Sequence, residues 1–102
     1  MPSKEYRIWL TDRAYIAVEF VMIRGRVVSF VVRLMLIGQD REVNVARYDT
    51  AHGAPHRDVL GQKGGLLQKT WYLDSDLGDI LRVAVDDFLQ HHDDYIQIYE
   101  AN

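Results

Sequence analysis

The sequence has no cysteine and only two prolines among its 102 residues. The absence of cysteine excludes a disulfide framework, a thiolate zinc site and a cysteine nucleophile. No apolar run is long and continuous enough to span a membrane, and residues 1–7 lack the apolar core of a signal peptide. We therefore expect a cytoplasmic protein that has no membrane association.

Basic residues are scarce in the last part of the chain. Residues 74–102 hold one Arg and eight acidic side chains, a net charge of −7, whereas residues 1–73 have a net charge of +4. This asymmetry predicts two electrically different surfaces. An acidic helix face in solvent is the plain explanation. The alternative, functional explanation is that the basic residues 1–73 bind RNA or phosphate, while the acidic residues 74–102 bind a basic partner.

Alternating apolar residues predict strands over residues 5–11, 15–24, 26–37 and 42–48. Gly25 lies between the second and third of these strands, where we expect a hairpin turn. Residues 68–73 predict a fifth, short strand. The short connections indicate an antiparallel meander. The length and the mixture of 48% hydrophobic with 26% charged residues fit one folded domain over residues 1–102.

A helix should begin after Asp74, Ser75 and Asp76, which are good capping residues. Its apolar positions recur with helical spacing at Leu77, Ile80, Leu81, Ala84, Val85, Phe88 and Leu89. Beyond residue 92 the pattern fits either a continued helix or an extended segment over residues 95–99. We therefore expect an α+β fold with an antiparallel β-meander of four to five strands and one C-terminal amphipathic helix packed on one face. Since one helix covers only one side of such a sheet, we also expect a homodimer.

Residues 49–66 contain four glycines and Pro55, and we expect them to form a long loop without an element of ordinary length. The segment 47–58, with the sequence RYDTAHGAPHRD, starts at the end of the fourth predicted strand and holds two His, two Asp and two Arg. This concentration of ionisable groups makes it the candidate functional segment.

Three interpretations of this segment remain open. Its pattern Asp-x2-His-x3-His-x-Asp offers up to four metal ligands, although such residues are common in polar loops. Alternatively, Arg47 forms an ion pair with Asp49 or Asp58 that fixes the loop to the sheet. The third interpretation is acid-base catalysis by the histidines without a metal or other cofactor.

Catalysis of RNA cleavage is the functional hypothesis that we develop. His52 and His56 are the predicted acid and base, with Asp49 beside them. Cleavage also requires cations that hold the phosphate. The predicted substrate-binding residues are Arg47, Arg57, Arg33 and Lys63.

The run Arg47-Tyr48-Asp49-Thr50-Ala51-His52-Gly53, followed by residues 55–58 and by Lys69-Thr70-Trp71, resembles a family of small uncharacterised prokaryotic proteins. More distantly, the Arg-Tyr-Asp strand end and its His-containing loop are similar to TumE-type toxins of toxin-antitoxin modules. That resemblance implies a small sheet domain that acts on RNA and is neutralised by a small antitoxin. Its matching positions are Arg47, Asp49, His52 and His56. The chain departs from the toxin pattern at Arg57 and Asp58, where further histidines are expected.

The alternative function is a non-enzymatic binding module, an adaptor or an inhibitor. Such a module would present a sheet edge or the acidic helix to a protein partner. In that case the segment 47–58 is scaffold, and its histidines affect stability more than activity.

Overall fold

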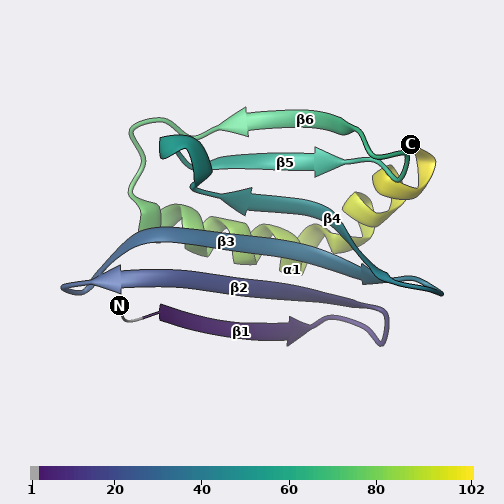
Figure 1. The fold of residues 1–102 in the computed structure, drawn as a ribbon, viewed down its shortest axis with the longest axis horizontal. Helices are drawn as coiled ribbons and strands as arrows, with labels where there is room; N and C mark the ends of the chain where they lie inside the picture. The colour runs from purple at the N-terminus through teal and green to yellow at the C-terminus, as the bar shows by residue number, and fades with distance from the viewer. Residues whose placement is uncertain (1–2) are drawn as a thin grey trace.

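The computed structural model describes residues 3–102, apart from the side chain of His52. Its strands form one antiparallel sheet in chain order. They are β1 (Ser3–Trp9), β2 (Ala14–Ile23), β3 (Arg26–Ile37), β4 (Glu42–Asp49), β5 (His56–Leu60) and β6 (Leu66–Trp71). The helix α1 (Leu77–Ala101) follows β6 and lies across one face of the sheet (Figure 1). The α+β class, the antiparallel meander and the C-terminal helix are confirmed, but the sheet has six strands instead of four to five.

The additional strand is β5, within the segment that we expected to be a loop. Residues 56–59 pair with β4 on one side, and all five residues pair with β6 on the other. Only a short 3-10 turn, η1 (Ala51–Gly53), separates β4 from β5. The sequence prediction was wrong because His56 and Asp58 are buried polar residues, and buried polar residues in a strand have the composition of a loop.

The hairpin between β2 and β3 is confirmed. Its two turn residues, Arg24 and Gly25, have φ of 52° and 77°. Positive φ at both central positions is the geometry that matches the twist of the flanking strands. Glycine adopts it without steric cost.

The helix α1 begins as its sequence predicts. The side chain of Asp76 caps it by accepting a hydrogen bond from the backbone N–H of Asp79 at 3.0 Å. The apolar stripe faces the sheet, where Ala84 and Phe88 are fully buried, but its last residue, Leu89, is 43% exposed. The helix departs from regular geometry at His91 and then continues to Ala101, so residues 95–99 are helical and not extended.

The opposite face of the sheet has no helix over it, and we call it the open face (Figure 1). Since side chains alternate along a strand, every second residue of each strand lies on this face. The main core lies between the other face and α1. None of the helical segments that the structure describes combines the length and the apolar character needed to cross a membrane.

A polar network lies within the interface between the sheet and α1. Tyr48 donates a hydrogen bond to Asp87 Oδ2 at 2.7 Å, and Tyr95 donates to the same oxygen. Arg57 Nη1 in turn donates to the Tyr95 hydroxyl at 3.1 Å. Burial, and after it the hydrogen bond to Asp87, raises the pKa of Tyr95 to about 12. The same two causes raise the pKa of Tyr48. The network thus holds both phenols protonated and joins α1 to β4 and β5.

We predict that the free energy of unfolding falls as the pH rises from 10 to 12. An unfolded tyrosine loses its proton near pH 10, whereas Tyr95 in the folded chain keeps it to about 12. The unfolded state is therefore favoured in this window, and the contribution of Tyr95 to the loss is on the order of 2 kcal/mol. Urea unfolding measured at pH 8 to 12 should show a smaller loss in Tyr95→Phe than in the wild type. Tyr6→Phe, at a position that is 44% exposed, is the control and should show the wild-type loss. Equal losses in all three proteins would contradict this role of Tyr95.

Candidate functional site

The end of β4 and the start of β5 place four ionisable residues of the segment 47–58 on the open face. In the ladder between these strands, Arg47 is opposite Asp58, and Asp49 is opposite His56. Because the strands alternate with a period of two, the side chains of all four residues point to the same face. The turn η1 makes this pairing possible, since it reverses the chain within the residues between Asp49 and His56.

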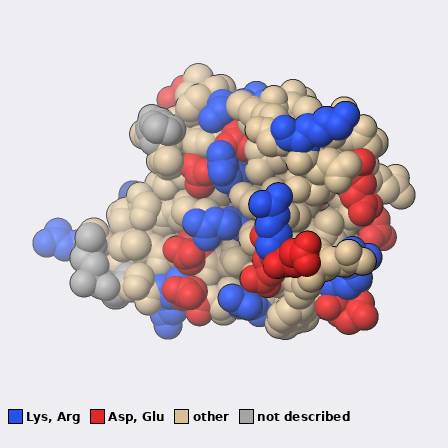
Figure 2. All heavy atoms as spheres, turned by 45° about the vertical axis from the view of Figure 1, so that its right-hand side comes forward, with Lys and Arg blue, Asp and Glu red and all other residues tan. Residues whose placement is uncertain are grey.

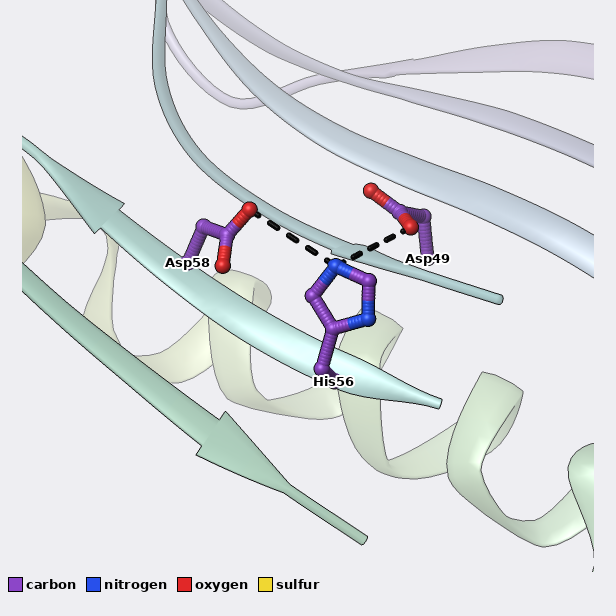
Figure 3. A group of neighbouring side chains, drawn as sticks. All are labelled: Asp49, His56 and Asp58. Carbon is purple, nitrogen blue, oxygen red and sulfur yellow. Dashed lines mark ion pairs between the residues drawn. The ribbon is translucent and has the colours of Figure 1, made fainter. Parts of the chain in front are cut away.

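His56 is held between two carboxylates and a backbone carbonyl. Its Nε2 lies 3.2 Å from Asp49 Oδ1 and 3.7 Å from Asp58 Oδ2 (Figure 3). Its Nδ1 lies 3.2 Å from the carbonyl oxygen of Ala54. The residue is 2% exposed. Both ring nitrogens therefore face oxygens of the protein, and the orientation of the ring is fixed.

Asp58 is fully buried and is surrounded by positive groups. Arg47 Nε lies 2.9 Å from Asp58 Oδ2, and Lys69 Nζ, from β6, lies 3.2 Å from Asp58 Oδ1. Oδ1 accepts no hydrogen bond within the described part of the chain, so Lys69 contributes by charge and not by hydrogen-bond geometry. The predicted ion pair of Arg47 is confirmed with both carboxylates, since its Nε is also 3.5 Å from Asp49 Oδ2. Two cations from the chain thus balance two buried carboxylates.

Trp71 covers the cluster from the side of β6. Its ring centroid lies 4.9 Å from that of His56, to which it is opposed in the ladder. Lys69 Nζ lies 5.3 Å from the centroid of the same indole ring. Trp71 remains 45% exposed, so it both shields the imidazole and offers an aromatic surface to solvent. We call Asp49, His56 and Asp58, with Arg47 and Lys69 over them, the Asp-His cluster.

The other predicted site residues are not part of the Asp-His cluster. Arg33, on the open face of β3, is opposed to Arg47 and forms an ion pair with Glu19 at 3.0 Å. Lys63 lies in the turn between β5 and β6, at the end of β5 away from His56. The side chain of His52 lies outside the described residues, so its predicted role stays a prediction from the sequence.

Arg57 points to the opposite face from its neighbours His56 and Asp58. It donates hydrogen bonds to the Tyr95 hydroxyl at 3.1 Å and to Gln68 Oε1 at 3.2 Å. This position places its guanidinium in the network under α1 and not beside Arg47. Arg57 and Arg47 therefore do not converge on one phosphate in this structure.

Lys69 and Trp71 join the cluster although they were not among the predicted site residues. The sequence carried a usable signal, because the two residues are two apart in a predicted strand and so share one face. What it lacked was the register that sets Trp71 opposite His56 and Lys69 opposite Asp58. Because β5 was not predicted, the strand that pairs with β6 was missing, and the residues opposite Lys69 and Trp71 could not be identified.

The cluster also has the donor set of a divalent-metal site. One ligand atom each from Asp49, His56 and Asp58 lies within 4.8 Å of the others. Imidazole and carboxylate are suitable ligands for several divalent ions. However, Arg47 and Lys69 already lie against the same carboxylates, so a metal ion would compete with two fixed cations. The arrangement therefore favours a site whose positive charge comes from Arg47 and Lys69 and not from a metal ion.

We predict that Asp58→Asn lowers the free energy of unfolding by about 2 kcal/mol, because the buried side chain loses its charge-assisted hydrogen bond to Arg47 and its ion pair with Lys69. The matched control is Glu19→Gln, which breaks an ion pair whose side chains are 37% and 47% exposed and should cost at most about 1 kcal/mol. Urea unfolding at neutral pH measures both. Similar losses in the two variants would show that Asp58 is not the centre of a buried charge network.

Comparison with known proteins places the chain in a family but not in a functional class. No curated protein and no solved structure matches the sequence. A family model described as a domain of unknown function, DUF7718, matches residues 1–102. Since the match extends over the full sequence given, the chain belongs to the DUF7718 family.

Proposed function

We propose that the chain acts on RNA as a ribonuclease-like protein of the toxin-antitoxin type, without a metal or other cofactor. The Asp-His cluster is the observation that carries this proposal. Burying carboxylates and an imidazole costs free energy, and well-packed apolar residues often replace such groups without loss of stability. Ionisable residues gathered at one point of an otherwise uncovered face therefore favour a functional site over a structural one.

Arg47 is the proposed phosphate anchor. Its Nε is bound to Asp58 and Asp49, while its side chain is 40% exposed. Among the residues that the structure describes, its two terminal Nη nitrogens have no hydrogen-bond partner. A guanidinium fixed at Nε and free at Nη can bind two oxygens of one phosphate. Lys69 adds a second positive charge to the same site.

The two histidines have different proposed roles. His56 has oxygens against both ring nitrogens, so in this arrangement it positions Asp49 and Asp58 and has no nitrogen free for the substrate. The sequence predicts His52 and His56 together as acid and base. In this proposal both proton transfers fall to His52, which takes the proton of the 2′-hydroxyl and gives it to the leaving oxygen. A small antitoxin that covers the open face would block the site, and RNA cleavage would take place in the cytoplasm.

The first test is cleavage of a labelled RNA by the purified chain in the presence of EDTA. We expect cleavage by the wild type and a rate at least about 100-fold lower for His52→Ala, which removes the proposed proton-transfer group. We expect a similar loss for Arg47→Gln, because the phosphate loses its anchor. The control is Arg82→Gln, an exposed residue of α1 on the opposite side of the sheet. Full activity in His52→Ala, or activity that EDTA abolishes, would overturn the proposed mechanism.

A second candidate function, binding of another protein, is favoured by an apolar groove between α1 and the β1–β2 side of the sheet. Tyr6 and Phe20 line it from the sheet and Leu81, Val85 and Leu89 from α1, together with the charged residues Arg82 and Asp86 of the helix. Tyr6 and Leu89 are more than 40% exposed. The partner that we propose is a second copy of the chain, because in a two-fold symmetric dimer the exposed apolar side chains around the groove of each copy cover those of the other.

We predict that light scattering of the eluting protein at micromolar concentration gives the mass of a dimer for the wild type and of a monomer for Leu89→Glu. A carboxylate at this position would have to give up its hydration when the apolar surfaces come together in the dimer. Gln90→Glu adds the same charge to the neighbouring exposed position and should remain a dimer. A monomeric wild type would remove the homodimer, and a dimeric Leu89→Glu would move its interface away from the groove.

A further inference from the structure

We propose that single-stranded RNA crosses the open face perpendicular to the strands, with its phosphates along a row of cations; this inference rests on the proposed action on RNA. The register aligns one residue of every strand in a continuous row across the sheet. The row consists of Arg7, Ala17, Arg33, Arg47, Asp58 and Lys69, each directly opposite the next. We call it the cation row.

The positive charges of the cation row reach the surface, whereas its one negative charge does not. The side chains of Arg33, Arg47 and Lys69 are 37%, 40% and 30% exposed, and Arg7 lies on the exposed strand β1. The side chain of Asp58 is fully buried beneath Arg47 and Lys69. A ligand above the sheet therefore meets four cations in line.

Acidic residues border the cation row on one side. The next row of opposed positions includes Glu5, Glu19 and Asp49. Figure 2 shows the resulting mixture of basic and acidic side chains over the surface in view. Glu19 is paired with Arg33, but both side chains are exposed, and such pairs are weak enough for a phosphate to replace the carboxylate. The remaining acids repel a polyanion and so limit its path to the row.

Aromatic residues border the cation row at both of its ends. On the β1 side, Trp9 and Tyr15 are opposed in the ladder with ring centroids 4.8 Å apart, and Arg7 lies 4.6 Å above the Tyr15 ring. On the β6 side, Trp71 is next to Lys69. Trp9 and Trp71 are 54% and 45% exposed. Exposed aromatic rings beside a cationic path are the usual means of binding unpaired bases, whose faces are hidden in a duplex.

The length of the cation row fits several nucleotides. Six strands give five spacings of about 4.8 Å, which is a path of about 24 Å. Single-strand binding domains of similar size contact roughly 4–16 nucleotides. Because Arg47 belongs both to the cation row and to the Asp-His cluster, an RNA bound along the row would bring one phosphate to the cluster.

The test is binding of a fluorescent 2′-O-methyl RNA of about 12 nucleotides, measured by anisotropy over a range of salt concentrations. This probe keeps the phosphates but has no free 2′-hydroxyl, so binding is measured apart from cleavage. Arg7→Gln and Arg33→Gln remove cations of the row that lie outside the Asp-His cluster. We expect each to weaken binding about fivefold and to reduce the slope of log affinity against log salt by about 0.7. Arg82→Gln, on the other side of the molecule, should bind as the wild type does.

Three outcomes would overturn the cation row as an RNA path. They are no binding by the wild type at low salt, equal weakening by Arg82→Gln and Arg7→Gln, and tighter binding of the corresponding duplex or of polyglutamate than of the single strand. Failure of the proposed nuclease gives a different pattern, in which this probe binds along the row while unmodified RNA is not cleaved. Conversely, cleavage with wild-type binding in Arg7→Gln and Arg33→Gln would support the nuclease and remove the row.

Discussion

The buried carboxylate of Asp58 is the constraint on which the candidate site depends. It lies in a strand of only five residues, and its charge is balanced by Arg47 from β4 and Lys69 from β6. A carboxylate in such a position is tolerated only when its partners are in place. A shift of β5 by one residue would turn Asp58 toward α1 and away from both cations. Charge balance therefore fixes the register of three strands, and this register sets Asp49 opposite His56.

The strand β5 serves two polar networks at once because its side chains alternate between the faces of the sheet. His56 and Asp58 enter the Asp-His cluster on the open face, while Arg57 enters the network of tyrosines and Asp87 beneath α1. The second network joins the helix to the sheet, and the first is directed to solvent through Arg47. The open face is thus available for a ligand, while the opposite face supplies stability.

Much of the fold could be predicted from local patterns. The hairpin at Gly25, the Asp76 cap and the apolar stripe of α1 depend on residues that are close in the sequence, and each is present as expected. The strand β5 could not be predicted in this way, because the charge of Asp58 is compatible with a strand only once Arg47 and Lys69 are brought to it. The candidate site was therefore predicted in part, with Arg47, Asp49 and His56 together but Arg57 and Lys63 elsewhere.

By itself, the sequence determined the strands other than β5, the helix, and which residues of a strand share a face, because these properties follow from periods of two and 3.6 residues along the chain. Only the tertiary structure decided which residues of different strands lie opposite one another. Arg7, Arg33, Arg47 and Lys69 are aligned by the pairing of the strands, and a single bulge or a turn of another length would separate them. Most elements thus follow from local patterns in the chain, whereas β5 and the site depend on the pairing of residues far apart in the sequence.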